Sequence, residues 1–152
     1  MIIPQDELKC NSTDKDNMEH FRSHFIELGL PHDAIEWLLM VVNASQVFDD
    51  YADGDHVKRK DLDNLIYSTL VLMPSNAFFQ RFSGSLLPVL SNVVMKWKAS
   101  DTVERCGQAD EKSFMWRAGF YDIILAVVTI VHGHEKAFEL SSKVLSIYGE
   151  TY

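Results

Sequence analysis

Apolar residues recur at helical spacing through most of the chain, and polar turn signals separate the segments in which they do so. No stretch of useful length alternates apolar and polar residues as a half-buried strand does. The spacing predicts helices over about residues 15–29, 32–52, 56–73, 76–83, 86–105, 110–133 and 135–148. We therefore expect an all-α fold, a compact single-domain bundle of about six or seven helices over residues 14–152, preceded by a flexible leader over residues 1–13.

Glycine, proline and serine mark the ends of these segments. Gly29-Leu30-Pro31 places a glycine just past one helix and a proline at the start of the next. Ser83 or Ser85 is expected to cap the helix that follows the short phenylalanine-rich one. With only 7 Gly and 4 Pro in 152 residues, the chain has few turn-formers, which favours a few long helices. The most apolar of them, 110–133, should lie at the centre.

The chain is acidic, and its charge argues against some classes of binding partner. With 22 Asp and Glu against 14 Lys and Arg, the formal charge is −8, so phosphate backbones and anionic membrane surfaces repel it. The apolar run 118–131 is shorter than the roughly 20 residues that a bilayer span needs. Cys10 and Cys106 form no metal-binding or disulfide pattern, and the first residues lack the features of a signal peptide. We expect a cytoplasmic protein with no direct contact to nucleic acid or membrane.

The most conspicuous chemical motif is the segment Asp49-Asp50-Tyr51-Ala52-Asp53. On a helix its carboxylates lie within one turn, and such a face can bind Mg²⁺ together with a diphosphate, because hard cations prefer several oxygen ligands. The segment resembles the aspartate-rich motif of the helical isoprenoid-diphosphate and terpene synthases. That resemblance implies a second metal motif on a later helix. The nearest series, Asn92, Lys96, Ser100 and Glu104, has lysine where the family has Ser or Thr.

The same residues can be tested as a calcium loop. A loop that starts at Asp49 has Gly54 at the sixth position, as an EF-hand requires. It has Tyr51 at the third position, however, and Lys60 at the twelfth, where a bidentate Glu is needed. The loop lacks its most important ligand.

A plain helix end is the remaining interpretation, with Gly54 in the left-handed conformation and Asp55 capping the next helix. This interpretation leaves three carboxylates at a helix C-terminus, where the helix dipole disfavours negative charge. A compensating cation is therefore expected nearby: Lys58, Arg59, another chain or a metal ion.

Asp122 is the second informative residue, since it is the only charged residue between Arg117 and His132. We expect it to be buried, with a partner that offsets the cost of desolvating its charge. The structural alternative is a hydrogen bond to an Arg, His, Tyr or Trp of a neighbouring helix. The functional alternative is that its helix face meets that of Asp50 and Asp53. The candidate metal ligands are thus Asp49, Asp50, Asp53 and Asp122, with Mg²⁺ or another divalent cation as the one cofactor considered.

The histidines and tryptophans carry weaker signals. His20 and His24 stand one helical turn apart, a spacing that can hold a metal, but an exposed helix face is the simpler explanation. Trp37, Trp97 and Trp116 are each consistent with a core position or an interface anchor.

Two functions from different classes are consistent with these patterns. The first is a non-enzymatic helical protein–protein interaction module, oligomeric, that presents an acidic surface to a protein partner or to another copy of itself. The alternative is a small Mg²⁺- or Mn²⁺-dependent enzyme that acts on a phosphorylated or diphosphate substrate through the aspartate cluster.

Overall fold

The computed structural model describes residues 11–148, which form helices joined by short turns, with no strand among them. The all-α prediction is confirmed. The elements are α1 (Asn11–Glu27), α2 (His32–Ala52), α3 (Arg59–Tyr67), the π-helix η2 (Ser68–Leu72), α4 (Met73–Ser75), α5 (Ala77–Arg105), α6 (Glu111–Arg117), α7 (Phe120–His132) and α8 (His134–Ile147). Because α1 begins at Asn11, the predicted leader overlaps a helix, and residues 1–10 lie outside the described part of the chain.

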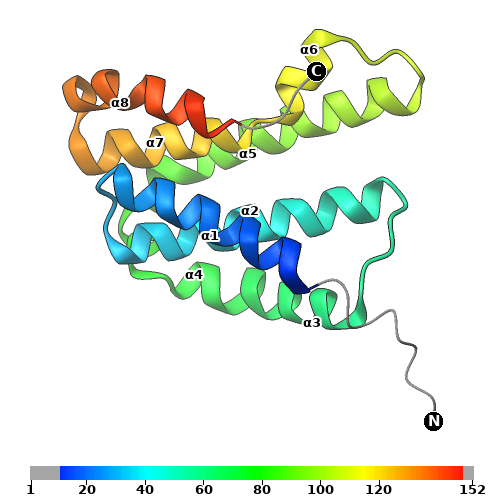
Figure 1. Ribbon diagram of the computed structural model, residues 1–152, viewed down its shortest axis with the longest axis horizontal. Coiled ribbons are helices and arrows are strands. Elements are labelled where there is room, and N and C mark those ends of the chain that lie inside the picture. The colour runs from blue at the N-terminus through cyan, green and yellow to red at the C-terminus, as the bar shows by residue number, and fades with distance from the viewer. Residues whose placement is uncertain (1–10, 149–152) are drawn as a thin grey trace.

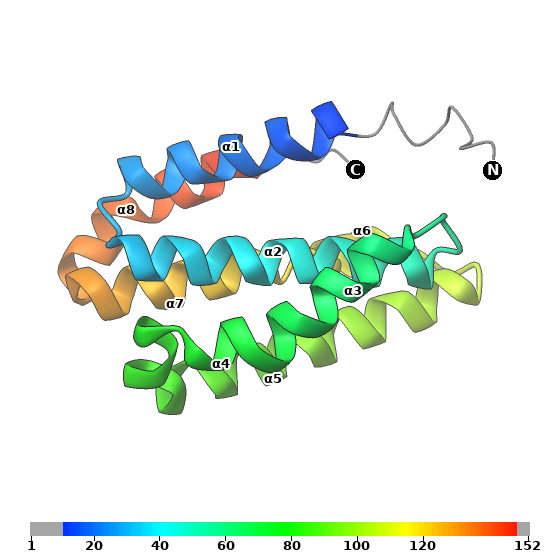
Figure 2. The same ribbon diagram turned by 90° about the horizontal axis from the view of Figure 1, so that it is seen from below.

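Figure 1 shows the helices in two groups, which overlap in the view from below in Figure 2. One group contains α1, α2 and the continuous run α3–η2–α4. The other contains α5, α6, α7 and α8, with α8 lying along α7. α2 packs against both α5 and α7 and so joins the two groups.

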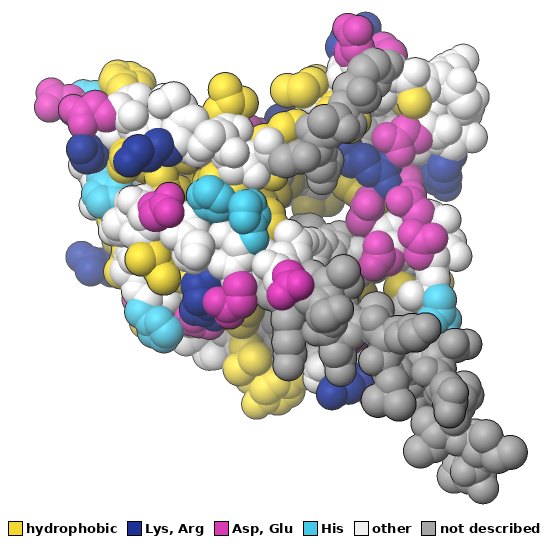
Figure 3. Space-filling view, in the orientation of Figure 1, with side chains coloured by type: hydrophobic (Ala, Val, Ile, Leu, Met, Phe, Trp, Pro, Cys, Tyr) yellow, Lys and Arg dark blue, Asp and Glu magenta, His cyan; other side chains and the backbone are white. Residues whose placement is uncertain are grey.

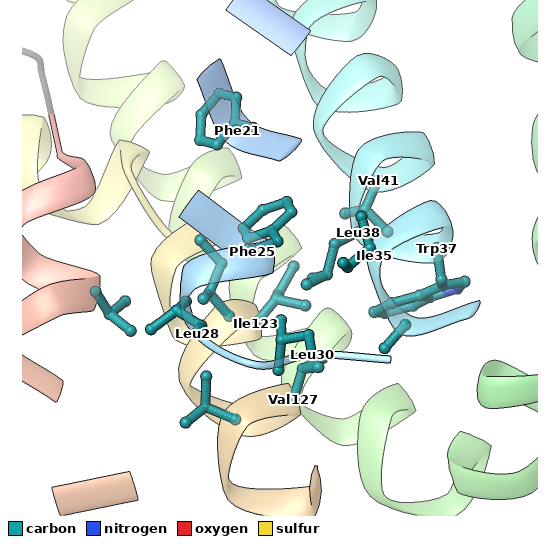
Figure 4. Close-up of a cluster of buried hydrophobic side chains, with 14 of the residues drawn as sticks. Phe21, Phe25, Leu28, Leu30, Ile35, Trp37, Leu38, Val41, Ile123 and Val127 are labelled. Carbon is teal, nitrogen blue, oxygen red and sulfur yellow. The ribbon is translucent and has the colours of Figure 1, made fainter. Parts of the chain in front are cut away.

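The core lies where α1, α2 and α7 meet (Figure 4). α2 carries no charge between Glu36 and Asp49, and α7 is apolar over most of its length, so both helices can be covered on several sides. The side chains of Phe25, Leu38 and Ile124 are fully buried there. Trp37 is also fully buried and stacks on Phe79, with ring centroids 5.6 Å apart, which assigns this tryptophan to the core.

The segment predicted as two helices, 76–83 and 86–105, corresponds to α5, in which two helices meet at a kink. It bends at Phe82, whose φ of −119° and ψ of 15° are not helical. Asn76 caps the start of α5, because its side-chain oxygen accepts from the Phe79 backbone N–H at 3.0 Å, and the cap predicted at Ser83 or Ser85 for the part beyond the kink stays a prediction. Asn76 also donates to the backbone carbonyl of Asp33 at 2.9 Å, which fixes the start of α5 against α2.

The segment predicted as one helix over 110–133 is broken into α6 and α7, which meet at an angle of 48°. The break falls at Ala118 and Gly119, where a Cβ on Gly119 would lie 3.0 Å from Val93 of α5. Because glycine has no Cβ, α5 can approach the backbone at Gly119 closely. Among the described helices, none is by itself long and apolar enough to cross a membrane. The bent pair of α6 and α7 meets both criteria only when the two helices are counted together.

The predicted helix 56–73 begins later, at Arg59, and continues as the π-helix η2. The Thr69 hydroxyl donates to the carbonyl of Leu65 at 2.7 Å, where the hydrogen-bond pattern changes from α to π. A side-chain hydroxyl thereby satisfies a carbonyl at this irregularity.

Candidate functional site

The aspartate motif lies at the C-terminal end of α2, beside the end of α6. Asp49 belongs to the last turn of α2 and Asp53 is its C-cap residue. Because these residues are four positions apart, their carboxylates project from one face of the helix. That face meets Arg117, the last residue of α6.

Arg117 binds both carboxylates. One terminal nitrogen donates to Asp49 Oδ1 at 2.5 Å and to Asp53 Oδ1 at 3.0 Å, and the other donates to Glu104 of α5. Burial lowers the pKa of Arg117, but the charge and hydrogen bond of Asp49, with the charges of Glu104 and Asp53, outweigh burial and raise that pKa above its usual value. Arg117 is therefore a compensating cation for this helix end.

Trp97 adds a second link to the same carboxylate. Its indole Nε1 donates to Asp49 Oδ1 at 3.1 Å, so one oxygen of Asp49 accepts from α5 and from α6. We call Asp49, Asp53, Glu104 and Arg117 the Arg117 cluster. Three carboxylates surround one guanidinium in it, which leaves an excess of negative charge. Figure 3 shows acidic side chains gathered at this end of the molecule, with basic side chains among them.

Asp122 is not buried, and this expectation is wrong. Its side chain is 46% exposed, and Lys96 of α5 donates to its carboxylate at 2.7 Å. The reason is the rotation of α7, which buries a face on the other side of Asp122, made of Ile123, Ile124, Val127 and Val128.

The four predicted metal ligands thus do not converge on one site. Asp49 and Asp53 bind Arg117, Asp122 binds Lys96, and Asp50 lies on the exposed side of α2. Within residues 11–148 no three His, Cys, Asp or Glu side chains form a group that would hold a metal ion. The metal site stays a prediction, without support from the geometry.

Three residues of the series Asn92, Lys96, Ser100 and Glu104, which was compared with the second metal motif, form contacts within the fold. Lys96 pairs with Asp122, and Glu104 pairs with Arg117. The Ser100 hydroxyl is buried and donates to the carbonyl of Trp97 at 2.9 Å.

Several histidines have defined contacts. The rings of His20 and His24 meet edge to face, with centroids 4.5 Å apart. His132 Nε2 lies 2.8 Å from the carbonyl oxygen of Leu28, and because a carbonyl only accepts, this nitrogen carries the hydrogen. His132 thus ties the end of α7 to the end of α1.

A second feature is an apolar surface on α3 and η2. Ile66, Tyr67, Leu70 and Val71 are 57%, 57%, 73% and 42% exposed. Steps of four residues place Ile66 with Leu70 and Tyr67 with Val71, so they form two adjacent stripes, which we call the apolar face. Leu65 and Ser68, on the opposite side, are buried. In Figure 3 hydrophobic side chains project from the lower edge, where Figure 1 places this run.

Comparisons of the chain with protein-family models, with curated proteins and with solved structures found no match.

Proposed function

We propose that this chain is a non-enzymatic, cytoplasmic protein-interaction module that binds a second copy of itself through the apolar face. The observation that carries the proposal is the exposure of Ile66, Tyr67, Leu70 and Val71 on one side of a helix whose other side is already packed. Single exposed apolar residues are ordinary, but a contiguous set on one helix marks an interaction surface. The exposed thiol of Cys106 is consistent with a reducing compartment.

The size of the apolar face fits a dimer. About half of each of the four side chains is exposed, which amounts to roughly 400 Å² of apolar surface per copy. Apolar atoms supply a little over half of a typical interface, so two such faces imply roughly 1,400 Å² of buried surface in total. That area lies within the range of specific, reversible complexes.

The charge around the apolar face also permits self-association. α3 carries two basic residues, Arg59 and Lys60, and two acidic ones, Asp61 and Asp63, while η2 carries none. Arg59 donates to Asp63 at 3.0 Å. Although the whole chain has a formal charge of −8, two copies can therefore meet at this locally neutral surface without strong repulsion.

The test compares two leucines of nearly equal exposure. Leu70 on η2 is 73% exposed and Leu145 on α8 is 71% exposed. In sedimentation velocity over a wide concentration range, we expect the wild type and Leu145→Glu to form a reversible dimer and Leu70→Glu to stay monomeric. A wild type that is monomeric throughout, or an equal effect of the two substitutions, would contradict the proposal.

A further inference from the structure

A cavity of about 460 Å³ opens between α1, α2, α8 and the junction of α6 with α7. Its volume is within the range of small-molecule sites. Its polar wall includes Asp49, Arg117 and Gln46, and its apolar wall includes Phe21 and Phe120. Trp97 and Tyr121 contribute to it from α5 and α7.

The charge at the polar wall favours a cation. Arg117 and His20 are the basic side chains among the described residues that line the cavity, and the two terminal nitrogens of Arg117 already bind three carboxylates. An anionic ligand would meet the excess negative charge of the Arg117 cluster. A cation would reduce that excess and would find the carboxylate of Asp49 on the cavity wall.

The aromatic side chains give the cavity a wall against which the apolar part of a ligand can pack. Phe21 and Phe120 meet edge to face, with ring centroids 5.6 Å apart, and Phe120 and Tyr121 do so at 6.1 Å. Aromatic faces attract organic cations, and the attraction grows where water is displaced. Neither the carboxylate nor the rings alone would select a ligand, but together they select a cation carried on an apolar group.

We infer that this cavity binds a small organic ammonium ion, with its charged nitrogen at Asp49 and its apolar body among Phe21, Phe120 and Tyr121. The inference does not depend on the proposed self-association. A monomeric protein would present the same cavity, because none of the apolar-face residues lines it.

The test uses 2-phenylethylammonium as the probe, with 2-phenylethanol as its neutral counterpart and 3-phenylpropionate as an anion. The readout is the indole cross-peak of Trp97 in ¹H–¹⁵N spectra, assigned by its loss in Trp97→Phe. We expect the ammonium ion to shift this peak saturably, with an affinity at least about tenfold above that of the alcohol, and the anion to leave it unchanged. Equal affinities for ammonium and alcohol, or no saturable shift with the ammonium ion, would overturn the inference.

Two carboxylate variants locate the bound charge. Asp49 and Asp122 each bind a basic side chain and are 36% and 46% exposed, but only Asp49 lines the cavity. We expect Asp49→Asn to weaken ammonium binding at least about tenfold and Asp122→Asn to leave it unchanged. If Asp49→Asn proves unfolded by circular dichroism, Phe120→Leu serves instead, because it removes a ring and no charge. Equal weakening by Asp122→Asn, or full binding by Phe120→Leu, would contradict the site.

Discussion

Arg117 is the residue at which three helices converge: it closes α6 and binds Asp49 and Asp53 of α2 and Glu104 of α5. Its side chain is only 18% exposed, so these charges interact with less screening than surface pairs do. Removal of the guanidinium would leave three carboxylates facing one another at the end of α2.

We therefore expect Arg117→Met to lower the free energy of unfolding by about 2 kcal/mol at pH 7, measured by urea denaturation. Combining it with Asp49→Asn should cost less than the sum of the two single substitutions, because the carboxylate left unpaired is removed as well. Arg59→Met is the control: Arg59 is 86% exposed, so loss of its bond to Asp63 should change stability by less than about 0.5 kcal/mol. Equal effects of Arg117→Met and Arg59→Met would show that the Arg117 cluster has no structural role.

The sequence indicated the carboxylates of this site but not their partner. Crowding of Asp49, Asp50 and Asp53 at a helix end predicted a compensating cation, and Arg117 supplies one. Nothing local points to Arg117, because it lies 64 residues from Asp53 and comes there with α6, which packs against α5. The burial of Asp122 was mispredicted for a related reason: an apolar helix does not reveal which of its faces is covered.

Among the elements, α5 and the α6–α7 junction are held together by close backbone packing. Gly119 is buried, and a Cβ there would meet Val93 Cγ1 at 3.0 Å and Val93 Cα at 3.5 Å. Gly84 lies within α5, and a Cβ added to it would have no neighbour within 4 Å. The two glycines therefore differ in what a methyl group would contact.

We expect Gly119→Ala to lower the free energy of unfolding by about 1–2 kcal/mol, because Val93 and the backbone of α5 must move. Gly84→Ala should raise it by about 0.5 kcal/mol, since alanine restricts the unfolded chain and favours the helix. Chemical denaturation of both variants checks the pair. A stabilising Gly119→Ala would contradict the close approach.

The start of α6 is set by a capping box in which Asp110 accepts from the Ser113 backbone N–H at 2.9 Å. This hydrogen bond, with smaller help from Lys112, lowers the pKa of Asp110 below its ordinary value of 3.8. A lowered carboxyl pKa in the folded state adds stability that is present above the unfolded pKa and is lost as the pH falls through the folded one.

The melting temperature of the wild type should therefore exceed that of Asp110→Asn at pH 7, because asparagine retains the cap but not the charge. The difference should shrink as the pH falls below about 3.8. Thermal melts of both proteins across this range make the measurement. A difference that stays constant down to about pH 2 would show that the charge of Asp110 contributes nothing.

Element boundaries were predicted well where a glycine or proline ends a helix, as at Gly29 and Pro31, and poorly where packing decides. The sequence predicted α2 over its observed range, 32–52. It placed a break next to the kink at Phe82 of α5, but it joined α6 to α7 across Gly119. This error concerns a segment that tertiary contacts bend, and local propensity does not report such contacts.

At the scale of the whole molecule, the Arg117 cluster and the apolar face lie on different elements. The Arg117 cluster gathers acidic side chains at the end where α2, α5 and α6 meet, while α3 and η2 present the apolar face with balanced charge. Self-association through the apolar face would leave the Arg117 cluster of each copy outside the interface, because none of its residues belongs to α3 or η2.

Intermolecular paramagnetic relaxation tests this central claim most directly. A nitroxide is attached at Asn64→Cys, on the exposed side of α3, in a chain whose Cys10 and Cys106 are replaced by serine. This spin-labelled chain, at natural isotope abundance, is mixed with ¹⁵N-labelled wild type. We predict selective broadening of the amide signals of Ile66–Leu72 in the ¹⁵N-labelled copy, because the two apolar faces lie against each other in the dimer. Absence of broadening at concentrations where both chains are abundant, or broadening confined to α5 or α8, would contradict association through this face.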